Sequence, residues 1–383
     1  LHLLSRRQRQ MCIRDRNKIL YLILFLLAAH ISSLYAQKFI PGAIWKDMDG
    51  VHINAHGGGI LLHNGIYYWY GTHMHENTAA ALKGVGVYSS ANLYDWKNEG
   101  IALEVFPEGS GHKIESGCLI ERPKVLFNEK TGKFVMWFHL ELKGQGYKAA
   151  EYGVAISDSP TGPFKFLHAG RSCSGIMPAN MESSVVEKLS SSVGLKARTP
   201  EWRAAMKEGL FVVRDLGKGQ MVRDMTIFVD DDRKAYHIFS SEENNTLHLV
   251  ELTDDYCGYT GKYVRVLPGR ANEAPAIFKH KGKYWLIASG CTGWDPNPAR
   301  MAVADDIWGP WKELENPCVG DKASTTFDSQ STFILPVPGA KNKWIFMADR
   351  WNSKNLKDSR YVWLPIEFEK GMPVLRWYDS WSY

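Results

Sequence analysis

The sequence predicts an all-β protein assembled from repeated four-stranded sheets, and two observations support this. An apolar strand, a polar or glycine-containing turn and an aromatic-rich strand recur at five places along the chain. Most of these hairpins are followed by a second strand pair. The five hairpins cover residues 59–70, 123–137, 225–238, 272–286 and 331–347. Repeated four-stranded sheets are typical of a β-propeller, so we expect a five-bladed β-propeller.

The second strand pairs have a signature of their own. Residues 86–96, 153–164 and 301–311 each begin with a short apolar strand and end on an aromatic residue. The hairpins themselves are unevenly spaced, with aromatic anchors at Tyr67, Phe134, Tyr236, Tyr284 and Trp344. This spacing indicates one blade per anchor, with loop insertions in the first two gaps. A β-sandwich is the alternative fold, but it does not explain the paired hairpins.

One segment, residues 180–220, departs from the β pattern. Within it, Thr199-Pro200-Glu201 reads as an N-cap, a proline at the first helical position and an acid in the first turn. A short helix over residues 202–210 is predicted to follow. We therefore expect a short helical insertion between blades two and three that lines a cleft or covers a blade.

The first 36 residues are predicted to lie outside the propeller. Residues 1–16 resemble a translated cloning adaptor. Lys18, the apolar run 19–29 and small residues up to Ala36 form the pattern of a secretory signal. Eleven apolar residues are too few to span a bilayer, which takes about 20. We expect residues 1–36 to be a non-native leader plus signal peptide, residues 37–383 to be the propeller domain, and the protein to be secreted or periplasmic.

The charge balance argues against a polyanionic partner. Six of the 46 Lys and Arg residues and one of the 41 Asp and Glu residues fall within the first 36 residues, which leaves 40 of each. Nothing in this balance indicates binding to nucleic acid or to an anionic membrane surface. No later segment is apolar for long enough to cross a membrane. We expect a monomer.

Three carboxylates, Glu121, Asp224 and Glu273, stand immediately before the first strand of a predicted blade. In a propeller these strand starts point to one end of the central axis, so the three acids should converge. Glycoside cleavage needs such a set, because one acid protonates the leaving oxygen while another activates water or tunes the first. Crowding also raises the pKa of one member. Taken singly, each acid could instead be a surface acid or form a buried ion pair with a neighbouring arginine, Arg122 or Arg223.

The remaining blades begin with other polar side chains. The first starts with His56 in front of a glycine triplet that begins at Gly57, where the backbone can approach a ligand closely. His56 could bind sugar hydroxyls or make a structural hydrogen bond. The fifth blade offers Asp328 and Gln330. Sequence spacing shows no zinc-type cysteine and histidine cluster. The residues expected to bind substrate are His56, Gly57, Asp224, Glu243, Trp294 and Trp351.

These motifs resemble those of glycoside hydrolase family 43, whose members are five-bladed propellers, over roughly residues 42–383. Glu273-Ala-Pro before Gly-Lys-Tyr resembles the family's general-acid motif. Glu121-Arg-Pro-Lys-Val resembles the site of its second carboxylate, which orients the acid and modulates its pKa. The family's usual base is an aspartate in an Ala-Asp-Pro setting near the start of the first blade. This sequence has Ala55-His56-Gly57 there.

That departure is similar to the exo-β-1,3-galactanase branch, which also lacks the aspartate base. In that branch a glutamine late in the propeller has been proposed to position or activate the water, and Gln330 matches it. The resemblance implies an exo-acting β-1,3-galactanase that cleaves the backbone of arabinogalactan by inverting single displacement. It implies Glu273, Glu121 and Gln330 as catalytic residues and an oligosaccharide or polysaccharide partner. No cofactor is required, and a structural Ca²⁺ on the propeller axis is compatible with the sequence.

Two other functions stay open at this point. One is an α-L-arabinofuranosidase or galactofuranosidase of the same fold, with Asp224 or Asp328 as an unrecognised base. The other is a sugar-binding propeller that has lost its base and no longer cleaves. Hydrolysis of small synthetic glycosides distinguishes the first from a galactanase, and binding of galactan without product release indicates the second.

Overall fold

The computed structural model describes residues 37–383 except 338, 340 and 341. Contacts within the chain separate two units. Of the first unit, residues 37–39 and 380–382 are described, and Phe39 and Trp381 form an antiparallel bridge. The second unit, residues 40–379 with 383, contains all the sheets described below. The predicted leader, residues 1–36, lies outside the described residues.

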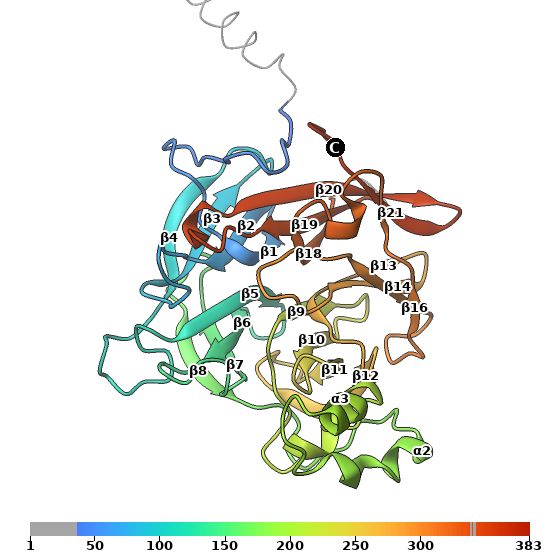
Figure 1. Ribbon diagram of the computed structural model, residues 1–383. Coiled ribbons are helices and arrows are strands. Elements are labelled where there is room, and N and C mark those ends of the chain that lie inside the picture. The colour runs from blue at the N-terminus through green and yellow to red at the C-terminus, as the bar shows by residue number, and fades with distance from the viewer. Residues whose placement is uncertain (1–36, 338, 340–341) are drawn as a thin grey trace, which may run out of the picture. The chain divides into compact units, whose positions relative to one another are not determined.

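The second unit is a five-bladed β-propeller, as predicted (Figure 1). Each blade is a sheet of four consecutive antiparallel strands, and the last blade gains a short parallel strand, β17, beside β21.

Blade one has β1 (His56–His63), β2 (Ile66–Thr72), β3 (Gly84–Ser90) and β4 (Lys97–Glu104). Blade two has β5 (Leu119–Asn128), β6 (Lys133–Glu141), β7 (Glu151–Ser157) and β8 (Lys165–Gly170). Blade three has β9 (Met225–Val229), β10 (Ala235–Ser241), β11 (Thr246–Leu252) and β12 (Tyr259–Val266). Blade four has β13 (Glu273–His280), β14 (Lys283–Ser289), β15 (Arg300–Ala304) and β16 (Lys312–Leu314). Blade five has β17 (Cys318–Val319), β18 (Gln330–Pro336), β19 (Trp344–Arg350), β20 (Arg360–Glu369) and β21 (Met372–Arg376).

The first strand of every blade lies at the centre of the propeller. Strand β1 contacts β5 and β18, β13 contacts β9 and β18, and β5 contacts β9, so these five strands close a ring. Figure 1 shows the five blades arranged around these central strands. The ring brings together side chains that are more than 200 residues apart in sequence.

Apolar side chains of the strands fill the spaces between neighbouring blades. One buried cluster joins blades one and two through Tyr70, Val85 and Met136, and similar clusters lie between the following pairs. Blades five and one are joined by aromatic rings, in which Trp69 packs within 4.8 Å of Trp363. Burial of these alternating residues against two neighbours accounts for the regular hairpin pattern in the sequence.

A β-bulge interrupts the first strand of four blades close to its start. The pairing register shifts between His56 and Gly59, between Glu121 and Lys124, between Glu273 and Ala276, and between Ser331 and Phe333. Three of these bulges contain a residue with a positive φ, namely Gly57, Arg122 and Ala274. A bulge redirects the side chains beside it. In these strands the regular antiparallel pairing follows the bulge and fixes the rest of the strand.

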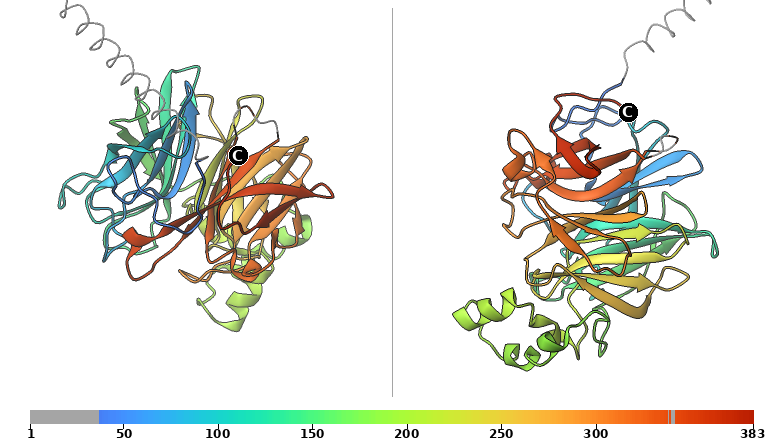
Figure 2. Two further views of the ribbon diagram at one scale, coloured as in Figure 1. Left: turned by 90° about the horizontal axis from the view of Figure 1, so that it is seen from above. Right: turned by 90° about the vertical axis from the view of Figure 1, so that its right-hand side faces the viewer.

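The helical insertion between blades two and three is confirmed. It contains α2 (Ser183–Val186), η1 (Leu189–Ser192), α3 (Pro200–Lys207) and η2 (Phe211–Asp215), and it lies beside β12 (Figures 1 and 2). Thr199 caps α3 by accepting a hydrogen bond from Trp202 N at 3.3 Å. The helix ends at Lys207 and not at Leu210, because Gly209 takes a left-handed conformation and turns the chain away.

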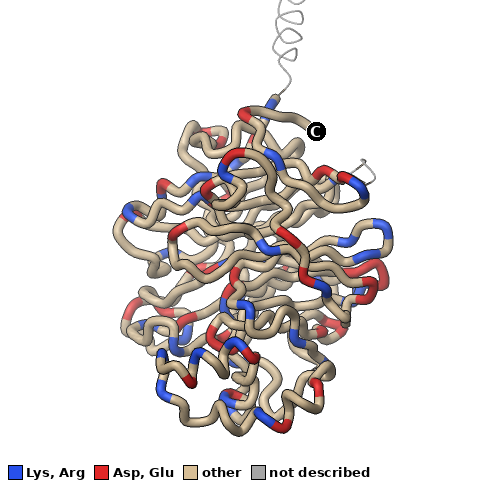
Figure 3. Tube along the Cα trace, turned by 45° about the vertical axis from the view of Figure 1, so that its right-hand side comes forward, with Lys and Arg blue, Asp and Glu red and all other residues tan. Residues whose placement is uncertain are grey.

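Acidic and basic residues are interspersed over the blades (Figure 3). Other helices of the described part are the single turns η3 (Ala323–Thr325) and η4 (Leu356–Asp358). Within the ranges that the structure describes, no helix has the length and apolar character needed to cross a membrane.

Candidate active site

A cavity of about 470 Å³ is lined by side chains from all five blades, several of them beside the bulges of the central strands. It brings together eight of the nine residues proposed from the sequence, namely His56, Gly57, Glu121, Asp224, Glu273, Trp294, Gln330 and Trp351. Glu243 is not among the lining residues. Its carboxylate lies 3.6 Å from Arg223 and 3.9 Å from Arg214, a residue of the helical insertion.

Glu273 is the first residue of β13 and is half-buried in the cavity wall. Burial raises the pKa of Glu273 to about 7, and the negative charge of Asp224 acts in the same direction. Arg122 and a hydrogen bond from Asn244 oppose this shift. Asn244 Nδ2 donates to Glu273 Oε1 at 2.7 Å, which leaves Oε2 as the oxygen available to carry the proton of the neutral acid.

Asp224 immediately precedes β9 and is tied to the strand starts of two other blades. Its Oδ2 lies 2.8 Å from Arg122 Nε and accepts a hydrogen bond from Ala274 N at 3.1 Å. Ala274 follows Glu273 in the chain, so Asp224 and the half-buried acid are held close together. Asp224 is therefore the carboxylate whose charge acts on Glu273.

Glu121 lies on β5 and lines the same cavity. Tyr147 donates its hydroxyl proton to Glu121 Oε1 at 2.8 Å, and His139 Nδ1 lies 2.9 Å from Oε2. Burial alone would raise the pKa of Glu121, but the contacts with His139 and Tyr147 hold it below its ordinary value. The lowered pKa of Glu121 therefore favours its ionised form, while the raised pKa of Glu273 favours the protonated form that a general acid needs.

Gln330, the first residue of β18, has an amide oxygen that accepts two hydrogen bonds. Arg122 Nη2 donates at 2.7 Å and Trp351 Nε1 donates at 3.0 Å, which uses both lone pairs of Oε1. Because both partners are donors only, the atom they face must be the oxygen. Gln330 Nε2 donates one hydrogen to Ser289 Oγ at 2.9 Å, and its second hydrogen is left for a ligand.

His56 and the two tryptophans complete the wall. The His56 ring is fully buried, stacks on Tyr361 at 5.2 Å, and its Nδ1 lies 3.8 Å from Asp349 Oδ1. Neither ring nitrogen has a hydrogen-bond partner among the described residues. Trp294 is 41% exposed and packs edge-on against Trp351 at 5.5 Å, so an apolar face is presented at the cavity mouth. Such faces stack on sugar rings.

A left-handed turn positions Asn244. Three consecutive residues, Glu242, Glu243 and Asn244, have φ between 53° and 62°. Arg265 forms two short contacts with Glu242, at 2.7 Å each, and Asn245 Nδ2 donates to Met206 O in α3 at 2.5 Å. A run of left-handed residues costs energy, and these contacts, with Arg265 of β12 and with Met206 of the helical insertion, hold it in place.

Four functional side chains were not predicted from sequence, namely Arg122, His139, Tyr147 and Asn244. Arg122 was considered only as a salt-bridge partner. The others come from β6, from the loop after it and from the left-handed turn, and none stands at a strand start. A polar histidine within an otherwise apolar strand, Phe138-His139-Leu140, was the one signal available in the sequence.

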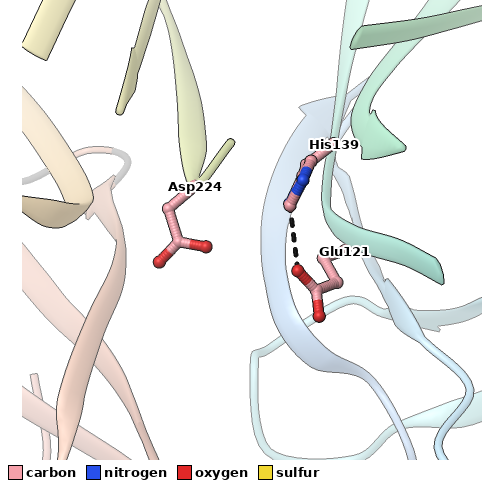
Figure 4. Close-up of side chains that lie close together, drawn as sticks. All are labelled: Glu121, His139 and Asp224. Atoms are coloured by element: carbon pink, nitrogen blue, oxygen red, sulfur yellow. Dashed lines mark ion pairs between the residues drawn. The ribbon is translucent and has the colours of Figure 1, made fainter. Parts of the chain in front are cut away.

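Glu121, His139 and Asp224 offer ligand-type atoms within 4.8 Å of one another (Figure 4). Figure 4 shows Asp224 facing the other two across the site. The chain already supplies cations here, because Arg122 pairs with Asp224 and His139 lies against Glu121. The buried Lys124 Nζ donates to Gly57 O at 2.9 Å and Arg122 O at 3.3 Å, and burial lowers the pKa of this amine well below its usual range. We assign no metal to these side chains.

The site therefore combines a carboxylic acid with a raised pKa, two further carboxylates, an amide donor and two tryptophan side chains at one end of a propeller. This is the equipment of a hydrolase that cleaves glycosidic bonds. The family model for glycosyl hydrolases family 43 matches residues 202–357.

Solved structures agree with this assignment. A GH43 β-1,3-galactosidase with galactodeoxynojirimycin is 55% identical with a TM-score of 0.84, over 90% of this chain and 100% of that one. An exo-β-1,3-galactanase from Phanerochaete chrysosporium with β-1,3-galactotriose is 31% identical with a TM-score of 0.72, over 90% and 68% of the two chains. One from Clostridium thermocellum is 36% identical with a TM-score of 0.72, over 90% and 66%. The search of curated proteins gave no match. The chain belongs to glycosyl hydrolase family 43 and is a glycosidase.

Proposed function

We propose that this glycosidase is an exo-β-1,3-galactanase that removes galactose from the non-reducing end of a β-1,3-galactan backbone, as found in arabinogalactan. The observation that carries the proposal has two parts. The pKa of Glu273 is raised, as a general acid requires, and the start of blade one places His56 in the cavity wall where an acid would otherwise stand. Relatives named as β-1,3-galactosidase or exo-β-1,3-galactanase support the substrate.

The reaction we propose is an inverting single displacement. Glu273 donates the proton on Oε2 to the leaving glycosidic oxygen, and its new charge is stabilised by the Asn244 N–H at Oε1. Asp224 keeps Glu273 protonated by like-charge repulsion. Glu121, proposed from the sequence to tune or orient the acid, lines the same cavity with a lowered pKa, and as an anion it can stabilise positive charge that develops on the sugar.

Gln330 holds the attacking water in this scheme, and it does so as a donor. Because the amide cannot take up a proton, the proton that this water loses on attack passes to solvent water, from which Glu273 later regains its own. The amide oxygen is occupied by Arg122 and Trp351, so the free Nε2 hydrogen is the contact available to a water molecule. We propose that His56 and the Gly57 backbone bind sugar hydroxyls, and that Trp294 and Trp351 stack on the sugar. Glu243 stands outside this scheme, because its carboxylate pairs with Arg223 and does not line the cavity.

Secretion and a monomeric state are part of the proposal. The apolar run 19–29 with small residues up to Ala36 supports export. The reaction needs no cofactor in this scheme, because Arg122 already supplies positive charge beside Asp224. A structural Ca²⁺ on the axis stays a prediction.

A substrate panel tests the proposal. Protein beginning at Gln37 is incubated with de-branched β-1,3-galactan and, separately, with synthetic arabinofuranosides and galactofuranosides. We expect galactose to be the product from galactan and little release from the furanosides. Cleavage of the furanosides alone would overturn the substrate and keep the glycosidase.

A further inference from the structure

Behind Glu121 lies a buried histidine that the proposed reaction does not use. His139 is directly opposite Glu121 in the register of β5 and β6. Its Nδ1 lies 2.9 Å from Glu121 Oε2, and its Nε2 lies 3.0 Å from Glu141 Oε1. His139 is 1% exposed and Glu141 is fully buried. Nε2 is hydrogen-bonded to Glu141, whereas Nδ1 approaches Glu121 as a close ion-pair contact and not as an aligned hydrogen bond. A nitrogen without a proton would place its lone pair against a carboxylate oxygen at this distance, so the two carboxylates favour the ring that is protonated at both nitrogens.

We propose that His139 is a positioning residue, an imidazolium held between Glu141 and Glu121 that keeps Glu121 ionised and fixed in the cavity wall. The inference rests on the proposed function, because it takes Glu121 to act in the site. His139 does not touch the substrate and acts through Glu121.

The charges packed around His139 favour the imidazolium. Strand β5 contributes Glu121 and Arg122, β6 contributes Glu141, the following loop contributes Tyr147, and the segment before β9 contributes Arg223 and Asp224. With His139 charged, three cations face three carboxylates. With a neutral imidazole the same buried group would carry an excess negative charge, which is costly in a site of low polarity.

Glu141, which contacts His139 Nε2, is itself held in place by the backbone. Its Oε2 accepts a hydrogen bond from Ala150 N at 2.9 Å, and Arg223 Nε lies 4.0 Å from its Oε1. Burial alone would lower the pKa of His139, but the contacts with Glu121 and Glu141 raise it to about 9. His139 therefore stays charged across the neutral range, and the pKa of Glu121 stays low.

The first test is the pH dependence of kcat/KM on β-1,3-galactan. In His139→Gln the pKa of Glu121 is no longer held down, so the carboxylate takes up a proton at higher pH as the solution is acidified. We expect the acid limb to move to higher pH by about one unit or more. His237→Gln is the matched control, because His237 is equally buried but bonded to Tyr259 outside the cavity. An acid limb that stays in place in His139→Gln, as in the control, would overturn the proposal.

The second test does not need a substrate. Histidine-labelled protein is titrated by NMR, and the His139 signal is assigned by its loss in His139→Gln or its displacement in Glu141→Gln. We expect a doubly protonated ring at pH 7. A neutral His139 ring at that pH would contradict the inference. If wild type releases nothing from galactan, the proposed function fails, and this titration alone decides the role of His139.

Discussion

At the scale of single residues, the assignment of Gln330 depends on which of its atoms remains free. The oxygen already accepts from Arg122 and Trp351, so only an N–H can meet the water. Gln330→Glu replaces that donor by an acceptor, while Gln330→Ala removes it. We therefore expect both variants to lose about 100-fold in kcat, the usual cost of one preorganised donor. Steady-state kinetics on galactan measure this. A Gln330→Glu enzyme as active as wild type would show that the position accepts the proton.

Glu273 sets the upper pH limit of the enzyme. A general acid works while protonated, so activity is fully present below a pKa of about 7 and is lost as the pH rises through it. In Asp224→Asn the neighbouring negative charge is removed, so the pKa of Glu273 falls. We expect the alkaline limb of kcat/KM to move to lower pH by about one unit.

The matched comparison for this prediction is Glu243→Gln. Its carboxylate lies outside the cavity and pairs with Arg223 and Arg214, so the alkaline limb should stay close to that of wild type. If Asp224→Asn leaves the limb where it is, the raised pKa of Glu273 comes from burial alone.

At the scale of elements, the helical insertion supports the site through the left-handed turn at Glu242. Glu242 is 1% exposed, and Arg265 makes two contacts with it while donating to Gly209 O at 2.5 Å. Arg265→Met would leave a buried carboxylate without its main partner. We expect a loss of about 3–5 kcal/mol in the free energy of unfolding, measured by denaturant titration.

The double variant Arg265→Met with Glu242→Leu checks the physical reason. Removing both charges leaves no unpaired carboxylate, so much of the lost stability should return. If the double variant is no more stable than Arg265→Met, the loss arises from packing of the insertion and not from a stranded charge.

The elements also show what the sequence could predict. The five hairpins were readable because alternating apolar residues meet a turn in each, and Glu121, Asp224 and Glu273 were readable because they stand at strand starts. The end of α3 was placed three residues too late, since Gly209 was not recognised as the residue that ends it. His139, Tyr147 and Asn244 were missed, because their approach to the carboxylates depends on bulges and on a left-handed turn that leave no simple sequence pattern.

At the scale of the whole molecule, ring closure creates the site. Residues 56, 121, 224, 273 and 330 lie far apart in the chain and meet only because β1, β5, β9, β13 and β18 surround one axis. Arg122 links three blades, since it is part of β5, pairs with Asp224 and donates to Gln330 and to Ser331 O. Site geometry and propeller closure are therefore coupled, and variants of Arg122 should impair both stability and activity.

The most direct test of the account is product analysis of de-branched β-1,3-galactan after incubation with wild type and with Glu273→Gln. The account predicts that wild type releases galactose and that Glu273→Gln, which keeps the shape but has no acidic proton, loses at least about 100-fold of that release. Equal galactose release by the two proteins would contradict the assignment of Glu273 as the acid. No release by wild type would contradict the proposed substrate.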